Sequence, residues 1–250
     1  MHRNIKTELV DFVGKNGIKK LNKAKVLILG AGAVGTNLIV NLSSIGINNI
    51  GVIDNDIIEK RNLSIQTLYT EKDIGKYKVE IAKKWVKKYN PEVNFNIYNI
   101  RLDENNYEAI FKDYDILVDA FDTQKSVLLE NKLAIKTNKP IIFTGTKDME
   151  SYVLTTIPNV TPCYNCFIEH NIENEEKEYG VFQSTGAIAA GIQTQEVIKL
   201  ILKKGRILHS SPLIFNGFSS TFFRPKIYKS NKQICEICGL PKISYKKFNE

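Results

Sequence analysis

The stretch Lys25-Val-Leu-Ile-Leu-Gly30-Ala-Gly32-Ala-Val-Gly35 decides the fold. Its first five residues predict a buried strand, and the glycines after them open a helix that we expect to reach about Ser44. In such a turn the first glycine permits a tight bend, the second lets the backbone approach a phosphate, and the third lets the helix pack closely on the strand. The stretch therefore predicts a nucleotide-binding unit with phosphate at the helix N-terminus.

Strands and helices alternate through the rest of the first 150 residues. A second strand, residues 50–54, ends at Asp54, about 20 residues after the glycines, where an acid hydrogen-bonds ribose hydroxyls. An amphipathic helix over 5–21 comes first, and we expect further helices over 75–89, 105–112 and 124–137 and strands over 93–98, 115–119 and 140–144. This alternation predicts a doubly wound α/β fold, a mostly parallel, Rossmann-like sheet covered on both faces.

The pattern changes after residue 150. We expect a strand over 152–156, a polar loop over 159–179, a long helix over 184–203, and strand-like segments at 213–216 and 221–228. Nothing indicates a second hydrophobic core, so we expect residues 1–250 to form a single domain. Its parts are an N-terminal helix (1–22), a nucleotide-binding half (23–156), and a remainder (157–250) of crossover loop, long helix, antiparallel strands and tail.

The four cysteines form two Cys-x-x-Cys pairs, Cys163 with Cys166 and Cys235 with Cys238. Two such pairs are typical of one tetrahedral zinc site with four thiolate ligands. Disulfides are the alternative, but they need an oxidising compartment. A zinc ion here would clamp the C-terminal tail to the loop after residue 156. Because every cysteine is then a ligand, none remains as a catalytic nucleophile.

Composition limits the partners. The chain carries 35 lysines and arginines against 27 acids, a net charge of +8. The lysines are spread along the chain, which is typical of solvated helix faces, so we do not expect a nucleic-acid partner. A basic surface does attract acidic proteins. No apolar run approaches the roughly 18 residues of a membrane span, and the start has no signal-peptide pattern, so we expect a cytoplasmic protein without a membrane partner.

The polar residues after the glycine loop indicate ATP rather than a dinucleotide. They are Asp54-Asn-Asp56, Arg61-Asn62-Leu-Ser-Ile65-Gln66, Gly75-Lys-Tyr-Lys78 and Asp119-Ala-Phe-Asp122. With the two cysteine pairs, their order and spacing resemble the ThiF/MoeB/HesA family of ubiquitin-activating-enzyme-like adenylyltransferases. The resemblance covers residues 3–240, nearly the whole chain, which makes it far more specific than any single motif.

The resemblance implies a reaction between ATP and a carboxylate, giving an acyl-adenylate and pyrophosphate. The carboxylate is usually the C-terminal glycine of a ubiquitin-like sulfur carrier of the ThiS or MoaD type, ending in Gly-Gly, in thiamine or molybdopterin synthesis. Two anionic reactants repel each other, so such a site needs cations and fixed geometry more than a base. The implied roles are phosphate binding by Gly30, Gly32, Gly35, Asn62 and Gln66, ribose contacts by Asp54 and Asp56, catalysis by Lys78 at the phosphates, and catalysis by Asp122 as the Mg²⁺ ligand.

The chain departs from the family pattern at two positions of the site. Ile65 stands where the family has an arginine, a loss of phosphate-binding charge that Arg61 replaces only if it reaches the same space. Thr123 stands where the family has asparagine.

Two further expectations concern partners. Relatives supply a catalytic arginine from the N-terminal segment of the partner subunit, which implies a homodimer. Arg3 is the matching residue, with Lys6 as the competing match. Because no cysteine lies between Cys166 and Gly186, covalent capture of the carrier is disfavoured. The adenylate would then react with a sulfur source held by another protein.

Three alternatives remain open. In the first, the activated carboxylate belongs to a peptide C-terminus or to a modified tRNA base, as in relatives within the superfamily. In the second, the chain is an ATP-binding scaffold that has lost catalysis, with Ile65 as the symptom. The third, an NAD-dependent oxidoreductase, would need a general acid at the hydride site, and we identify none in the sequence.

Overall fold

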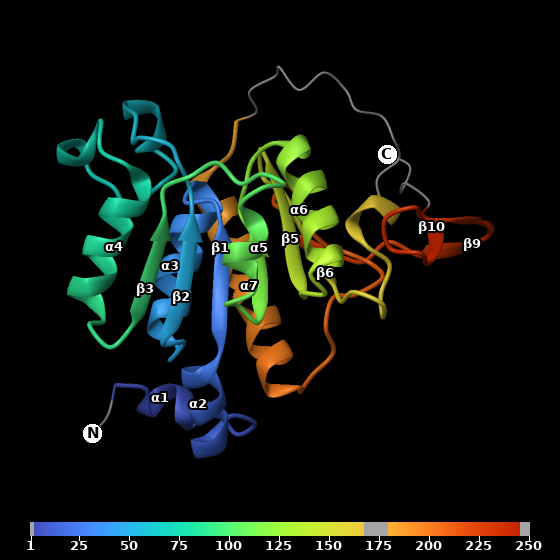
Figure 1. Cartoon of the computed structure of the whole chain (residues 1–250), viewed down its shortest axis with the longest axis horizontal. Coiled ribbons are helices and arrows are strands. Elements are labelled where there is room, and N and C mark those ends of the chain that lie inside the picture. Colours follow the sequence, from blue (N-terminus) through green and yellow to red (C-terminus); the bar gives the residue numbers. More distant parts are fainter. Residues whose placement is uncertain (1–2, 168–179, 246–250) are drawn as a thin grey trace.

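One mixed sheet organises the chain. The computed structural model describes residues 3–167 and 180–245, within which the sheet has the strand order β3-β2-β1-β4-β5-β6-β7-β8 (Figure 1). Neighbours from β3 to β5 are parallel, and those from β5 to β8 are antiparallel. The strands are β1 (Lys25–Leu29), β2 (Asn49–Ile53), β3 (Asn94–Tyr98), β4 (Ile116–Asp119), β5 (Ile141–Lys147), β6 (Glu150–Thr156), β7 (Leu213–Asn216) and β8 (Thr221–Phe223). The predicted doubly wound, mostly parallel sheet is confirmed.

The central strand β1 is buried on both faces. Val26 and Ile28 enter the core on one side of the sheet, and Leu27 and Leu29 enter the core on the other side. All four side chains are fully buried. Since successive residues of a strand point to opposite faces, a strand between two cores must be apolar throughout. The continuous apolar run in the sequence has this origin.

The helices form two layers, visible on opposite faces of the sheet in Figure 1. Apolar side chains of α3 (Ala33–Ser44), α4 (Lys78–Tyr89) and α7 (Gln183–Leu202) share the core of Val26 and Ile28. Those of α5 (Tyr107–Phe111) and α6 (Gln124–Lys136) share the core of Leu27 and Leu29. Among the described helices, none is both long and apolar enough to cross a membrane.

Two expected elements are wrong in detail. The single helix over 5–21 is two helices, α1 (Ile5–Glu8) and α2 (Gly14–Lys23). Gly14, the first residue of α2, has a φ of +57°, a left-handed backbone angle that cannot occur in the interior of a continuous right-handed helix. The segment 221–228 is likewise divided between β8 and β9 (Ile227–Ile234), with Pro225, which has no N–H to donate, between them. Strand β9 pairs antiparallel with β10 (Pro241–Tyr245) in a separate sheet.

The topology places a site at one edge of the sheet. From β1 the chain proceeds to β2 on one side, and β4 lies on the other side. Ligands of open α/β sheets bind at such a reversal, outside the carboxyl ends of the strands. The glycine loop follows β1 at this edge, Asp54 follows β2, and Asp119 ends β4.

Shortening one side chain of the central strand tests whether a hydrophobic core lies against this face of the sheet. Leu27→Ala should lower the free energy of unfolding by about 2–5 kcal/mol, because it removes a fully buried side chain and leaves a cavity. Leu9→Ala is the matched control, since Leu9 is 66% exposed, and should change it by less than about 0.5 kcal/mol. Urea unfolding measures both, and equal effects of the two substitutions would contradict the assignment of the core.

Candidate active site

The glycine loop has a geometry that side chains would prevent. Gly30 has φ of +109°, and a β-carbon on Gly35 would collide with the carbonyl oxygen of Gly30. A β-carbon on Gly32 would meet nothing nearer than Nε2 of Gln66, at 3.9 Å. No side chain caps the N-terminus of α3, which begins after Gly32. The first turn of α3 therefore presents its N–H groups to the open space beside Gly32.

Asp54 holds the glycine loop to the end of β2. Its carboxylate accepts hydrogen bonds from the N–H groups of Ala31 and Asp56, both at 2.8 Å. The residue is buried, and this burial raises the pKa of its carboxyl, while Lys78 and the two N–H donors act in the opposite direction. Tyr69 donates to the carbonyl oxygen of Ala31 at 2.9 Å and secures the loop from a second side.

Lys78 and Asp56 form an ion pair at the floor of the site. Lys78 is the first residue of α4, and its Nζ lies 2.8 Å from Oδ2 of Asp56. The Lys78 side chain is only 7% exposed, whereas that of Asp56 is 64% exposed. The ammonium group is therefore fixed in position, and a bound phosphate would compete with Asp56 for it.

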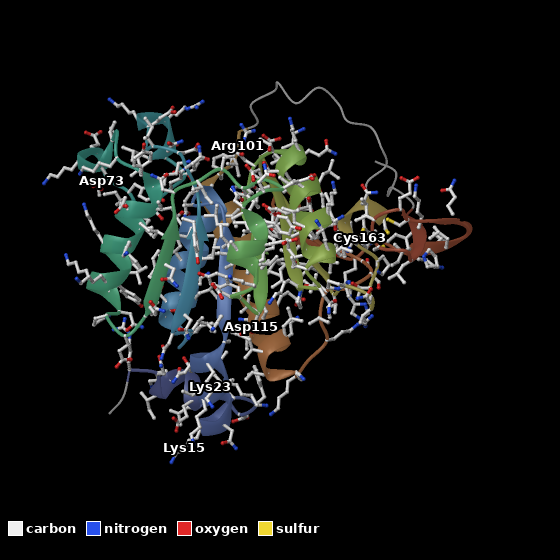
Figure 2. All side chains as sticks on the ribbon, viewed as in Figure 1. Lys15, Lys23, Asp73, Arg101, Asp115 and Cys163 are labelled. Carbon is white, nitrogen blue, oxygen red and sulfur yellow. The ribbon has the colours of Figure 1, made fainter. Side chains whose placement is uncertain are left out.

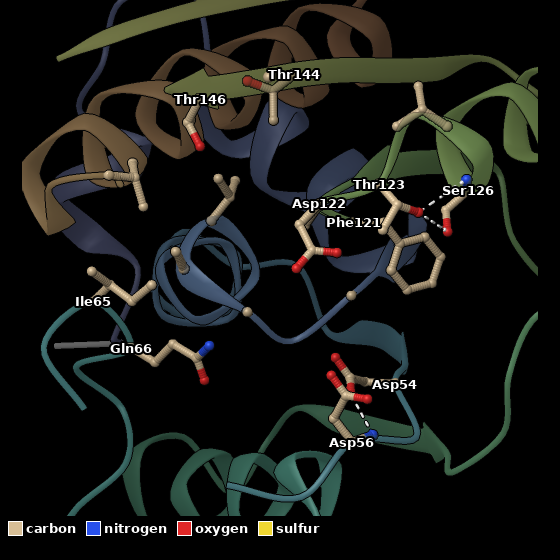
Figure 3. Close-up of a pocket in the computed structure, with 18 of the residues that line it drawn as sticks. Asp54, Asp56, Ile65, Gln66, Phe121, Asp122, Thr123, Ser126, Thr144 and Thr146 are labelled. Atoms are coloured by element: carbon tan, nitrogen blue, oxygen red, sulfur yellow. Dashed lines mark hydrogen bonds between the residues drawn. The ribbon is translucent and has the colours of Figure 1, made fainter. Parts of the chain in front are cut away.

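The segment after β2 brings three further residues to the site. Gln66 is buried, and its Oε1 has no hydrogen-bond partner. Oδ1 of Asn62 accepts the N–H of Glu59 at 2.9 Å, so this oxygen helps to form the short 3₁₀ helix η1 (Lys60–Asn62). Ile65 is half-buried beside Gln66, at the position where the family pattern has arginine (Figure 3).

Asp122 points into the space above the glycine loop (Figure 3). The next residue, Thr123, is the N-cap of α6 and accepts the N–H of Ser126 at 3.2 Å. Since Thr123 performs the capping, Asp122 has no such role, and its side chain is exposed to the cleft. A carboxylate oxygen in this setting is a suitable ligand for Mg²⁺.

These residues surround a cleft of about 930 Å³. Of the predicted site residues, those lining it are Gly30, Gly32, Asp54, Asp56, Asn62, Gln66, Lys78 and Asp122, whereas Gly35 lies behind the loop inside α3. Arg61 also lines the cleft, and it forms an ion pair with Glu59 at 2.6 Å. Arg101 and Lys125 are cations of the cleft that the motifs do not reveal. Both follow the carboxyl end of a parallel strand, which is the topological signal that would have identified them.

Arg3 does not reach the cleft of its own chain. Its guanidinium carbon lies 4.6 Å from the centre of the Tyr89 ring. Tyr89 ends α4, and Lys78 begins it, so the length of the helix separates Arg3 from the site (Figure 1). A catalytic role of Arg3 therefore requires a second copy of the chain and stays a prediction.

The four cysteines converge into one cluster at the C-terminal end of the molecule, where Figure 2 labels Cys163. The sulfur–sulfur distances are 3.9 Å from Cys163 to Cys166, 3.8 Å from Cys163 to Cys235, and 3.6 Å from Cys166 to Cys238. Four sulfurs placed tetrahedrally at about 2.3 Å from a zinc ion would be about 3.8 Å apart. The cluster thus fits zinc in number, ligand type and spacing.

Helix α6 connects the cysteine cluster with the cleft. Nδ2 of Asn131 lies 3.5 Å from Sγ of Cys163, and its Oδ1 accepts the N–H of Tyr164 at 3.0 Å. Asn131 is buried. Because α6 begins directly after Asp122 and Thr123, one short helix touches both sites.

Comparison with known proteins agrees with this geometry. The sequence model of the ThiF family matches residues 2–238. The chain belongs to the ThiF family. A ThiF relative, the probable molybdopterin-synthase adenylyltransferase of Gracilaria tenuistipitata var. liui, is 34% identical over 226 residues, which are 89% of this chain and 64% of that protein. The sulfur carrier protein adenylyltransferase of Thermus thermophilus is 29% identical over 236 residues, 91% of this chain and 86% of that protein.

Solved structures show the same fold. E. coli MccB with ATP has a TM-score of 0.77 and 30% identity, covering 89% of this chain and 68% of MccB. MccB with MccA-N7isoASN has a TM-score of 0.82 and 26% identity, covering 96% of this chain and 76% of MccB. Membership of the ThiF family and the similarity to MccB solved with ATP support ATP as the ligand of the cleft. This ThiF chain spans slightly less than two thirds of the Gracilaria protein, and only about half of some other curated relatives.

Removing one sulfur tests the metal cluster. Cys163→Ser should reduce bound zinc from about one per chain to far below one and lower the melting temperature, because a structural zinc contributes folding free energy. Glu236→Gln, at an exposed position between Cys235 and Cys238, should change neither quantity. Metal analysis and calorimetry provide the measurements, and unchanged zinc in Cys163→Ser would contradict the assignment.

Proposed function

We infer that this ThiF chain is an ATP-dependent adenylyltransferase that activates the C-terminal glycine carboxylate of a ubiquitin-like sulfur carrier. The observation that carries the proposal is the position of Asp122 over the uncapped N-terminus of α3, with the fixed ammonium group of Lys78 in the same cleft (Figure 3). A helix N-terminus and a lysine bind phosphate, and an exposed carboxylate binds Mg²⁺. Together they suit a polyphosphate with its metal.

The chain would bind and orient the two reactants. The α3 N-terminus, Gln66 and Asn62 would hold phosphates, and Asp54 and Asp56 would contact the ribose. Asp122 would hold Mg²⁺, which when bound neutralises charge on phosphate oxygens. The carrier carboxylate would attack the α-phosphorus, forming the acyl-adenylate and expelling pyrophosphate. A carboxylate is already ionised at neutral pH, so the step needs charge neutralisation and alignment but no general base.

The relatives support one class of carboxylate. Two of them carry the names molybdopterin-synthase adenylyltransferase and sulfur carrier protein adenylyltransferase. These names support a sulfur-carrier protein as the substrate. We propose a carrier of the ThiS or MoaD type ending in Gly-Gly, serving thiamine or molybdopterin synthesis. Every cysteine of these 250 residues lies in the cluster, which supports adenylation without a catalytic cysteine and a separate sulfur-donor protein. In the proposed homodimer Arg3 would serve the facing site, because within its own chain it lies over the ring of Tyr89.

The second candidate is a different carboxylate. The MccB structures with MccA-N7isoASN and with N-formylated MccA support activation of a peptide C-terminus by this fold. A modified tRNA base would be a further candidate substrate for the same type of reaction. The half-buried Ile65 in place of an arginine supports the scaffold alternative, in which ATP binds without turnover.

Exchange of labelled pyrophosphate into ATP decides among these functions. A MoaD- or ThiS-type carrier ending in Gly-Gly should stimulate exchange, because only a suitably placed carboxylate makes the adenylate reversibly. The same carrier lacking its last two residues is the control and should not stimulate. Stimulation only by a peptide or tRNA would establish the second candidate, and ATP binding without any exchange would establish the scaffold.

Asp122→Ala tests the proposed metal ligand. Exchange should fall on the order of 100- to 1,000-fold, because the phosphates lose a charge-neutralising anchor in the transition state. The matched control, Asp113→Ala, removes an exposed carboxylate outside the cleft and should leave exchange unchanged. Full exchange by a folded Asp122→Ala protein would exclude the role.

A further inference from the structure

Two carboxyl groups lie against each other beneath the cleft. Asp119 ends β4, and Glu130 is on the second turn of α6. Both residues are 0% exposed, and their side chains hydrogen-bond each other. The family resemblance assigns no role to Glu130, and the helix pattern of the sequence gives no reason to expect an acid at a buried position.

The two acids have unequal surroundings. Oδ1 of Asp119 accepts the N–H of Phe121 at 3.0 Å, and its Oδ2 accepts the N–H of Thr144 at 3.2 Å. The oxygens of Glu130 have no hydrogen-bond partner other than the Asp119 carboxyl group. Two carboxylates contain no donor, so their hydrogen bond requires a proton between them. Backbone donors stabilise charge on Asp119, which leaves the proton on Glu130.

Few other charges act on this pair. Asp122, in the exposed turn after β4, is the further carboxylate that raises the pKa of Asp119. Helix α7 contributes neutral Gln193, whose Nε2 donates to the main-chain oxygen of Asp119 at 2.8 Å, β5 contributes Thr144, and η3 (Tyr164–Cys166) contacts α6 through Asn131. No lysine or arginine in the described ranges forms a salt bridge with either acid. Burial is the main cause that raises the pKa of both carboxyl groups.

We propose that Glu130 is a positioning residue that keeps its proton and donates it to Asp119, so that Asp119 holds the turn carrying Asp122. The turn is short: Asp119 binds the N–H of Phe121, and Asp122 is the next residue. Through Thr144, Asp119 also fixes the end of β5, which lines the same cleft. The role rests on the proposed adenylyltransferase site, because it acts through Asp122.

The pair makes the site sensitive to alkaline pH. Loss of the shared proton would leave two negative charges in a dry site, and the Asp119–Glu130 hydrogen bond would be replaced by repulsion. Because burial raises the pKa of Glu130, the folded state binds this proton more strongly than the unfolded state. The stabilising contribution is complete below the ordinary carboxyl pKa and decreases as pH rises through the folded value.

Three variants test the role. Glu130→Gln keeps a neutral donor that cannot ionise, so its affinity for Mg-ATP and its exchange at neutral pH should stay within about tenfold of the native values. In the native chain, Mg-ATP affinity and exchange should decrease at alkaline pH. This decrease should be absent in Glu130→Gln. Glu130→Leu leaves buried Asp119 with its two backbone donors but without the side-chain donor, and should weaken Mg-ATP binding roughly tenfold to a hundredfold. The exposed Glu92→Gln is the matched control and should behave as the native chain.

Infrared spectroscopy supplies a measurement that does not depend on enzymatic activity. It also does not require that the Glu130→Leu variant folds. The native chain at neutral pH should show the carbonyl stretch of a buried protonated carboxyl, and Glu130→Gln should lack that band. Absence of the band, or identical pH profiles for the native chain and Glu130→Gln, would overturn the proposal. If no carboxylate stimulates exchange but the band and the pH profile of Mg-ATP binding behave as stated, the proposed function fails and the role of Glu130 stands.

Discussion

The close approach of α3 to the end of β1 is the constraint on which the site depends. No β-carbon fits at residue 35, because it would strike the carbonyl oxygen of Gly30. Bare backbone at both positions lets α3 begin directly over the carboxyl end of the central strand, with its N–H groups uncapped. Strands β2 and β4 flank β1, so the loops that follow them meet at the same point. A larger residue at position 35 would shift α3. The N-terminus of α3 would then move relative to every other group of the cleft.

The acidic motifs at two strand ends of this site share one arrangement, in which a buried acid is followed by an exposed acid. Asp54, directly after β2, and Asp119, at the end of β4, are buried, and each accepts two backbone N–H groups. A carboxylate bound in this way fixes a turn, and that of Asp54 also lines the cleft. The second acids of the two motifs, Asp56 and Asp122, are exposed to the cleft. The spacings Asp-x-Asp and Asp-x-x-Asp therefore encode one acid that shapes the loop and one that faces the ligand.

The sequence predicts most of the parallel sheet because burial on both faces requires apolar strands separated by amphipathic helices. It fails where a single backbone angle or residue decides, as at Gly14, which divides the N-terminal helix, and at Pro225, before which β8 ends. The motifs predict the residues that line the cleft near the glycine loop. The motifs do not identify Arg101 and Lys125, because the segments that follow two separate strands bring these residues to the cleft. This is a consequence of topology that no local sequence pattern contains. The sequence does not predict the burial of Glu130, because an acid in a helix is ordinarily exposed.

Helix α6 joins features that look independent in the sequence. Within its 13 residues it is capped beside Asp122, carries the buried Glu130, and at the next position places Asn131 against Cys163 and Tyr164. A metal held by the cysteines would fix Cys163 and so the middle of this helix, because Asn131 binds both the sulfur and the adjacent backbone. A helix fixed at Asn131 would also hold the preceding residue, Glu130, against Asp119, and Asp119 binds the turn of Asp122. The cysteine cluster, although outside the cleft, thereby contributes to the position of the acid that faces it.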